Sequence, residues 1–360
     1  MQKKYLFVLL LVLLILTACQ ASQAKSIDVP TKDISFQASS TPISKTPSPT
    51  IEQKSPESKR IILPTQAPTY RVSIMAVGDI MLGRTIGDLI LEEGYQAPFI
   101  YTAETLSKAD ITIGNLECPI SNRGEAVQKK YFFRAPVDAA KSLSFAGFDI
   151  LSLGNNHSLD YGPDALFDTL TLLDSEDIHT IGAGMDEKEA YEPVFTSVNG
   201  IKLAFLSFVD VPTTDFDYLT WEARPHQPGI AWAHKNKVKQ GVKLAKKEAD
   251  IVIVMVHNGF EFWQKVSDKQ QEIAKLAIDN GASLVIGSHP HVLQRIETYK
   301  NGLIAYSMGN FVFDNFLFPP NYSAILSVEL SPQGIESYEL IDVVVSLEGI
   351  PQIMSYTIEE

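Results

Sequence analysis

Two histidines that lie two residues apart form the stretch of this sequence with the clearest chemical potential. His289 and His291 belong to segment 287–292, which reads GSHPHV and follows the apolar run 282–286. Such a run is typical of a buried strand, and side chains two positions apart in an extended loop point to the same side. Imidazole is a common protein ligand for transition metals. The pattern therefore predicts a metal held at the carboxyl end of a strand.

Other apolar runs are also followed, within a few positions, by a residue that can bind a metal or move a proton. These residues are Asp79, Glu117, Asn156, His157 and His257. A single Asp or Glu in such a place is more often a helix cap or a turn residue, so the argument depends on the recurrence. Carboxylate, amide oxygen and imidazole together suit one or two divalent ions such as Mn²⁺, Fe²⁺ or Zn²⁺. Two such ions about 3.5–4 Å apart can activate a water molecule between them.

The elements that would position these residues alternate along the chain. Apolar runs typical of strands are separated by stretches with helical spacing of apolar residues. Helices are expected over residues 85–93, 137–145, 163–175, 233–249 and 268–280. The pair Asn199-Gly200 indicates a tight hairpin, and residues 210–232 read as a loop that could form part of a substrate-facing rim. This order predicts an α/β domain whose sheet faces are covered by helices, with its site at the strand ends.

Length, charge and cysteine content limit the classes of function. The 360 residues suffice for one large domain or two modest ones. The formal net charge of −13 argues against nucleic acid as a partner, because phosphate binding needs a basic surface. The two cysteines, Cys19 and Cys118, form no disulfide framework. Cys118 is interpreted as a small buried hydrophobic residue rather than a reactive thiol.

The N-terminus reads as a targeting segment. Lys3 and Lys4 precede an apolar stretch over residues 5–16, which is short for a membrane span. The stretch ends in Leu-Thr-Ala-Cys at 16–19, which resembles a bacterial lipobox and predicts a lipid on Cys19. An ordinary signal peptide and an uncleaved anchor are the alternatives. In each case the rest of the chain is expected to lie outside the cytoplasmic membrane, and a lipid would anchor it there as a lipoprotein.

The remaining sequence divides into three parts. Residues 1–18 are expected to be the lipoprotein signal peptide. Residues 19–68 are rich in Ser, Thr and Pro and are expected to form a disordered tether, because they offer little apolar surface to offset the entropy of ordering. Residues 69–360 are expected to form the folded domain.

Seven motifs occur in an order that resembles one bacterial family. They are GDIMLGR (78–84), GNLE (114–117), FRAP (133–136), GNNHSLDYG (154–162), HNGFE (257–261), GSHPHV (287–292) and SMGNFVFD (307–314). In this order the chain resembles the capsule-synthesis family CapA over residues 71–314. That family has the poly-γ-glutamate capsule protein domain and belongs to the calcineurin-like metallophosphoesterase superfamily.

The resemblance implies a four-layer α-β-β-α sandwich with a metal site at the strand ends. By the superfamily pattern, Asp79 is the first-motif ligand and Glu117 stands at the bridging carboxylate. The same pattern assigns one metal to Asn156, His257 and His289, and the other to His291. It also implies that His157 is the proton donor or stabilises an oxyanion near the leaving group.

Two departures from the superfamily pattern bear on the chemistry. The first motif is usually Asp-x-His, but Met81 stands two residues after Asp79, and Glu117 replaces the usual bridging Asp. One metal position therefore lacks an imidazole. The site could bind a single metal, bind the second one weakly, or have left phosphoester chemistry.

Further polar residues of these motifs receive roles as hypotheses. Arg84 and Arg134 would bind an anionic group of the substrate, because guanidinium suits carboxylates and phosphates alike. Stacking on the neighbouring aromatics is an equal alternative for Arg134. Glu261 would be a general base or would orient His257, and Asp160 would orient His157. Asn310 is expected to contact substrate.

Three functions are compatible with these features. The protein could be a metal-dependent hydrolase of an amide or ester bond in an extracellular polymer such as poly-γ-glutamate or a wall component. It could be an accessory factor in poly-γ-glutamate capsule synthesis or export, working with a ligase or export proteins in the membrane. It could also be a phosphoesterase. Capsule polymer synthesis or processing is the favoured role, with an anionic extracellular polymer or a small envelope molecule as substrate.

Overall fold

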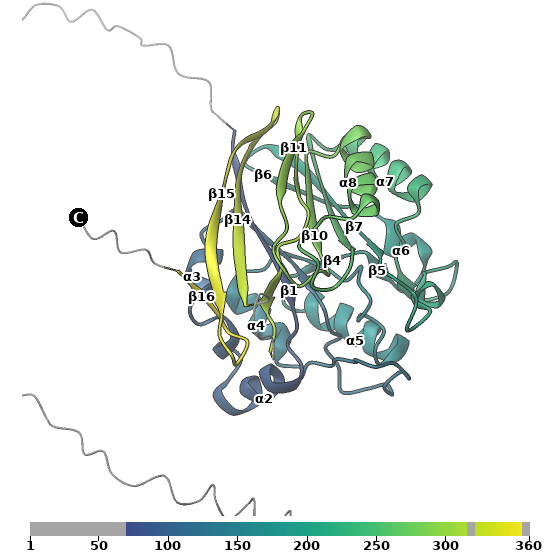
Figure 1. Cartoon of the computed structure of the whole chain (residues 1–360), viewed down its shortest axis with the longest axis vertical. Coiled ribbons are helices and arrows are strands. Elements are labelled where there is room, and N and C mark those ends of the chain that lie inside the picture. The colour runs from purple at the N-terminus through teal and green to yellow at the C-terminus, as the bar shows by residue number, and fades with distance from the viewer. Residues whose placement is uncertain (1–69, 315–320, 355–360) are drawn as a thin grey trace, which may run out of the picture. The chain divides into compact units, whose positions relative to one another are not determined.

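Two β-sheets pack face to face, and helices cover their outer sides (Figure 1). The computed structural model describes residues 70–314 and 321–354. The expected signal peptide over 1–18 and the tether over 19–68, with Cys19, lie outside these residues and stay predictions. Within the described ranges, no helix has the length and apolar character needed to cross a membrane.

The first sheet combines parallel and antiparallel strands. Its order is β16 (Pro351–Ile353), β15 (Gly334–Val345), β14 (Tyr322–Ser331), β1 (Val72–Ile80), β2 (Ile111–Leu116), β3 (Ile150–Ser152) and β4 (His179–Ile181), with β13 (Asn310–Val312) beside β1. Strands β1 to β4 run parallel. The C-terminal strands β14, β15 and β16 extend the sheet with antiparallel pairs.

The second sheet has a parallel centre and antiparallel edges. Its order is β11 (Ile296–Tyr299), β12 (Gly302–Ala305), β10 (Leu284–Ser288), β9 (Ile251–Asn258), β7 (Ile201–Asp210) and β6 (Val194–Val198). The predicted hairpin joins β6 to β7, where Val198 pairs with Ile201. Asn199 and Gly200 have φ values of 50° and 81°, as a tight two-residue turn of this kind requires. A separate pair of short strands is formed by β5 (Ala183–Gly184) and β8 (Gly229–Ile230).

The helices fall into two groups. The outer side of the first sheet packs against α2 (Arg84–Glu93), η1 (Ala97–Phe99), α3 (Ala103–Leu106), α4 (Ala139–Ala146) and α5 (Gly162–Asp174). The outer side of the second sheet packs against α7 (Lys235–Glu248) and α8 (Asp268–Asp279). The short helices α6 (Glu187–Tyr191) and η2 (Tyr218–Trp221) lie in connections. The five helices expected from the sequence are present, with ends within about two residues of the expected ones.

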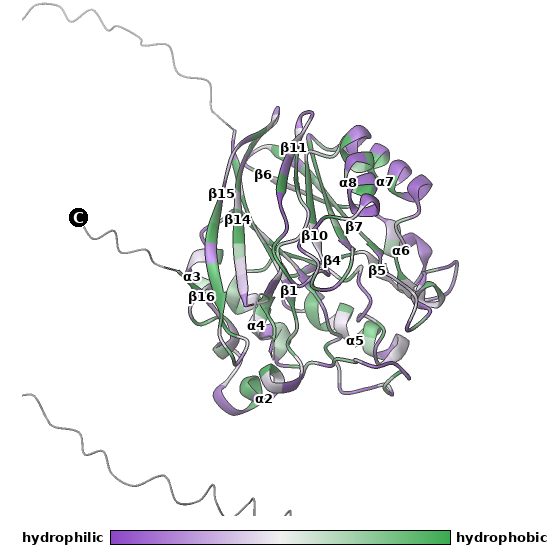
Figure 2. Cartoon of the chain, in the orientation of Figure 1, coloured by the Kyte–Doolittle hydropathy of each residue, from purple (hydrophilic) through white to green (hydrophobic). Residues whose placement is uncertain are grey.

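Burial follows the spacing of apolar residues. On α7 the buried residues Val238, Val242 and Ala245 form one stripe, which is the spacing of a helix that faces a core on one side. Figure 2 shows α7 and α8 as largely hydrophilic helices beside the hydrophobic strands of the second sheet. Separate apolar clusters lie between the two sheets and beneath each helix group. The predicted four-layer α-β-β-α sandwich is therefore confirmed.

Candidate metal centre

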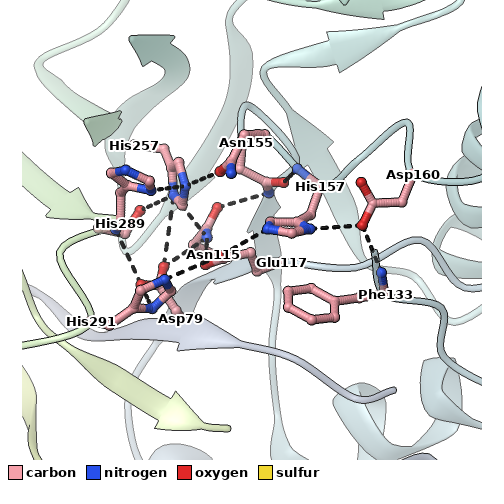
Figure 3. A network of polar contacts seen from close by, with 12 residues as sticks. Asp79, Asn115, Glu117, Phe133, Asn155, His157, Asp160, His257, His289 and His291 are labelled. Carbon is pink, nitrogen blue, oxygen red and sulfur yellow. Dashed lines mark hydrogen bonds and ion pairs between the residues drawn. The ribbon is translucent and has the colours of Figure 1, made fainter. Parts of the chain in front are cut away.

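The carboxyl ends of strands from both sheets meet at one place, where most of the polar side chains predicted from the strand ends point toward one another (Figure 3). Asp79 lies in β1 and His257 in β9, whereas the others follow β2, β3 and β10 within about five residues. They are Asp79, Glu117, Asn156, His157, His257, His289 and His291, and none is more than 6% exposed. The fold thus brings together residues that are far apart in the sequence.

Asn156, His257 and His289 form one group of donor atoms. His257 Nε2 lies 2.7 Å from Asn156 Oδ1 and 3.2 Å from His289 Nδ1. Ligands of a tetrahedral zinc ion lie about 3.4 Å apart, so these separations suit three ligands of one ion. His289 has a φ of 95°, a conformation that non-glycine residues rarely adopt outside functional sites. The structure therefore brings together the three residues that the resemblance assigns to one metal.

Asp79, Glu117 and His291 form a second, adjacent group. One donor atom of each lies within 4.8 Å of the other two. Within this group His291 Nδ1 lies 3.3 Å from Asp79 Oδ2, and His291 Nε2 lies 3.7 Å from Glu117 Oε1. This arrangement of carboxylates and an imidazole could hold a divalent cation.

The electrostatics of the two carboxylates fit a bound cation. Burial raises the pKa of Glu117 well above its usual value, and the nearby Asp79 raises it further. Burial also opposes ionisation of Asp79, but hydrogen bonding and charge from His291 outweigh it and lower the pKa of Asp79. Glu117 Oε1 is buried and has no hydrogen-bond partner among the described residues. A cation would satisfy that oxygen and remove the repulsion, so the residues present fit a metal.

The imidazoles of His257 and His289 are held in the neutral form that metals bind. Burial lowers the pKa of His257 to about 3 and lowers that of His289 well below its usual value. A neutral imidazole offers a lone pair at one ring nitrogen. His257 Nδ1 lies 2.8 Å from Ser288 Oγ, and this contact directs Nε2 toward Asn156 and His289.

Two asparagines outside the predicted set support the carboxylates. Asn115 Nδ2 donates to Asp79 Oδ1 at 2.8 Å and to Glu117 Oε2 at 3.4 Å. Asn155 Nδ2 donates in turn to Asn115 Oδ1 at 3.1 Å. A signal for both existed in the sequence, because each follows the glycine at the start of a strand-end motif. Oriented amides of this kind fix the direction of ligand oxygens.

His157 is fixed on both of its sides. Its Nδ1 lies 2.7 Å from Asp160 Oδ2, and the Phe133 ring stacks on the imidazole with 4.2 Å between centroids. Phe133 N also donates to Asp160 Oδ2 at 2.6 Å. His157 Nε2 faces Glu117 Oε1 at 3.8 Å. The contact with Asp160 agrees with the orienting role expected for that residue.

Lys129 is a further residue of the site that the sequence reasoning missed. Its side chain is 2% exposed, and Nζ lies 2.5 Å from Asp160 Oδ1. Nζ also donates to the Asn156 carbonyl at 2.6 Å. The rings of Tyr218 and Trp221 lie about 5 Å from Nζ, at 5.1 and 5.0 Å. Those two residues belong to the loop expected to form a rim, so part of that loop does lie beside the site.

A pocket of about 230 Å³ opens beside His157 and His291. Its walls are formed by Arg84, Tyr131, Phe133, His157, Glu261, Phe262, His291, Phe313 and Asp314. Arg84 forms an ion pair with Asp314 and lies over the Phe133 ring, 4.8 Å from its centroid. Glu261 is an exposed residue of this wall. Both ring nitrogens of His257 face other partners, Ser288 and Asn156, so the two roles expected for Glu261 stay predictions.

Comparison with known protein families assigns the chain to one of them. Residues 73–315 match the family described as "Bacterial capsule synthesis protein PGA_cap". The chain belongs to this family. The resemblance to CapA proteins stated from the motifs is thereby confirmed.

Individual relatives agree with this assignment. A capsule biosynthesis protein CapA of Bacillus anthracis is 30% identical over 298 residues, which cover 81% of this chain and 71% of the relative. A PGA biosynthesis protein CapA of Bacillus subtilis (strain 168) is 32% identical over 278 residues, which cover 76% and 72%. Among solved structures, a hypothetical protein from Thermus thermophilus is 16% identical, with a TM-score of 0.48, and covers 75% of this chain and 98% of its own.

The remaining predicted residues of this PGA_cap chain have other surroundings. Arg134 is exposed, lies over the Tyr161 ring at 4.1 Å, and is not among the described residues that line the 230 Å³ pocket. This stacking is the alternative considered for it. Asn310 is fully buried, and its Oδ1 lies 2.8 Å from His291 Nδ1. The geometry therefore favours a positioning role for Asn310 over contact with substrate.

Two residues in or beside the first two motifs lie in the core. Met81 is fully buried in the apolar cluster beneath the helices of the first sheet, and its Sδ accepts from Gly83 N at 3.1 Å. It leaves the second carboxylate-rich group without the imidazole that the superfamily pattern places there. Cys118 is fully buried, and burial raises the pKa of its thiol to about 12. Its interpretation as an inert buried residue is supported.

Proposed function

We propose that this PGA_cap protein acts in the synthesis or processing of a capsule polymer of the poly-γ-glutamate type, through a divalent metal at the strand ends. The observation that best supports a metal is the state of Glu117 Oε1. This buried carboxylate oxygen has no hydrogen-bond partner in the described chain and lies beside Asp79 and His291. The names of the two Bacillus relatives, which refer to capsule and PGA biosynthesis, support the biological role. The N-terminal motif at Cys19 supports a lipid-anchored protein outside the cytoplasmic membrane.

In this proposal the metal would be held by Asn156, His257 and His289 or by Asp79, Glu117 and His291. When bound, a divalent ion polarises a substrate oxygen or lowers the pKa of a water molecule. With its proton on Nδ1, His157 donates a hydrogen bond to Asp160 Oδ2, which leaves Nε2 facing the site and able to accept or return a proton. The aromatic walls formed by Phe133, Phe262 and Phe313 would exclude water from the reacting group.

A hydrolytic role is favoured over a purely structural metal for one reason. A structural metal site is usually closed by its ligands and needs no proton carrier, whereas His157 is held by Asp160 beside an open pocket. Hydrolysis of an amide or ester in the polymer or another envelope molecule is the chemistry we propose. A non-catalytic polymer-binding accessory is the second candidate, and a partner ligase or export protein in the membrane fits both.

The test is metal analysis of the full chain purified without chelator, beside a His289→Ala/His291→Ala variant. It is paired with hydrolysis assays on poly-γ-glutamate and on a generic phosphodiester. Metal that the variant loses, together with turnover of the polymer, would support the proposal. Metal without turnover of either substrate would favour the accessory role. Absence of metal after Mn²⁺ or Zn²⁺ is supplied would refute the metal assignment.

A further inference from the structure

A second pocket lies on the opposite side of the loop that leaves β9. Its volume is about 180 Å³, and its walls include Asp210, Asn258, Phe260 and Lys269. Asp210 and Asn258 are the last residues of β7 and β9 and pair across the sheet. They lie one position beyond Val209 and His257, so their side chains point to the other face of the sheet from the metal centre.

One polar atom in this pocket lacks a hydrogen-bond partner. Asp210 is 5% exposed, its Oδ1 accepts from Lys269 Nζ at 2.6 Å, and its buried Oδ2 has no hydrogen-bond partner among the described residues. Asn258 is 4% exposed and also lines the pocket. Buried carboxylate and amide groups rarely stay unpaired, because an unmade hydrogen bond costs roughly 1–3 kcal/mol.

The charge of the pocket restricts its ligand. The carboxylate of Asp210 and the ammonium of Lys269 form an ion pair, so they offer a ligand no net charge. Lys269 would repel a cationic ligand, and Asp210 would repel an anionic one. A neutral ligand that donates to Asp210 Oδ2 and exchanges hydrogen bonds with the Asn258 amide fits both groups.

An aromatic side chain forms the apolar part of the wall. Phe260 is 42% exposed and packs against Trp263, with 4.8 Å between ring centroids. An exposed ring beside hydrogen-bonding groups offers a flat apolar surface next to polar partners. A sugar ring has this combination, since it carries hydroxyls at its rim and C–H groups on its faces.

From this arrangement we propose that Asp210, Asn258 and Phe260 form a saccharide-binding site separate from the metal centre. The pocket has room for a single monosaccharide-sized group. The loop between the two pockets is shared, because Phe260 faces this one whereas Glu261 and Phe262 line the pocket beside His291. A glycan held here would therefore lie next to the entrance of the metal centre. The proposal does not depend on the metal or on capsule chemistry.

The test is isothermal titration of the full chain, in a detergent without a sugar headgroup, with glucose, galactose, N-acetylglucosamine and chitotetraose. We expect at least one of these to bind with millimolar or tighter affinity, in EDTA as well as in Mn²⁺. Asp210→Asn and Phe260→Ala should each weaken that binding at least five-fold. Phe195→Ala is the matched control, because Phe195 is also 42% exposed but lies on β6.

Several outcomes would overturn the proposal. These are the absence of binding to every sugar of the panel, equal binding by wild type and both pocket variants, and loss of binding on chelation. Thermal unfolding of each variant shows whether it is folded. If Asp210→Asn fails to fold, Phe260→Ala alone decides the outcome, because its side chain is exposed.

Discussion

Glu117 is the residue whose surroundings depend most on a bound cation. In the absence of metal its carboxylate is buried beside Asp79, and its Oε1 has no hydrogen-bond partner in the described structure. Asn115 supports its other oxygen. The same residue is therefore a source of strain without metal and a ligand with it.

The first prediction follows from that double role. In EDTA at neutral pH, Glu117→Gln should raise the free energy of unfolding, because the wild type must either bury a carboxylate beside Asp79 or take up a proton to neutralise it. With Mn²⁺ at about 100 times its dissociation constant the wild type should gain about 2.7 kcal/mol, and the variant should gain less. Urea unfolding in both buffers measures the two effects. A variant that is less stable than wild type in EDTA would contradict the metal assignment, because Glu117 would then be stabilising by itself.

The second prediction concerns Lys129. Lys129→Met should lower the free energy of unfolding by about 3 kcal/mol, because it leaves the Asp160 carboxylate buried without its partner. Adding Asp160→Asn to that variant should recover part of the loss, since no charge is then left unpaired. Lys108→Met is the control, because Lys108 pairs with Glu104 on the surface and exposed pairs contribute little. Equal urea midpoints for the Lys129 and Lys108 variants would show that the buried pair is dispensable.

At the scale of single residues, the sequence showed which residue types form the site but not what surrounds each of them. Asp79, Glu117 and the histidines could be found because each lies at or after the carboxyl end of an apolar run, and these ends meet where the two sheets face each other. Lys129 could not, because a lysine next to Lys130 is typical of a solvated surface. Its burial depends on Tyr218 and Trp221, which come from a distant loop.

At the scale of elements, close backbone contacts set the position of the ligand loops. Gly287 lies in β10, directly before the segment with His289 and His291, and a Cβ there would lie 2.0 Å from the Tyr306 carbonyl oxygen. That oxygen is backbone and cannot turn away as a side chain can. The glycine therefore lets β10 and the chain after β12 approach closely enough to place both histidines.

The third prediction tests this approach. Gly287→Ala should lower the free energy of unfolding by about 3 kcal/mol and reduce the bound metal, because β10 must move. Gly241→Ala on α7 is the control. The added Cβ there would lie 3.0 Å from the tip of the Leu206 side chain, and alanine favours a helix by up to about 1 kcal/mol over glycine. Thermal unfolding and metal analysis measure both variants, and unchanged metal content in Gly287→Ala would refute the role in placing the loop.

The helices and the hairpin could be predicted because their apolar residues or turn residues follow a clear pattern in the sequence. The stripe Val238, Val242 and Ala245 marks α7, and the hairpin at Asn199-Gly200 has a specific turn sequence. The packing of two sheets against each other could not be predicted in this way. The run 251–256 is buried on both sides, and such a run does not show which strands or helices are its neighbours. That part of the fold came from the motif resemblance.

At the scale of the whole molecule, charge and proposed substrate oppose each other. The chain has a formal net charge of −13, and poly-γ-glutamate is a polyanion. Long-range repulsion would disfavour their association, so binding would depend on a local positive centre such as a metal. The basic helix α7 is the other place where an anionic polymer could make contact, through Lys239 and Lys243 among others.

The fourth prediction separates these two contacts by their response to salt. Binding of the Mn²⁺-loaded full chain to poly-γ-glutamate should strengthen as ionic strength rises from about 10 to 150 mM, because the screening length falls from roughly 30 to 8 Å. Repulsion between the distant charges is screened over that range, whereas a contact at the buried metal is screened much less. Isothermal titration at both ionic strengths measures the change. Weaker binding at higher salt, abolished by Lys239→Glu/Lys243→Glu, would instead place the polymer on α7, away from the strand ends where the metal residues gather.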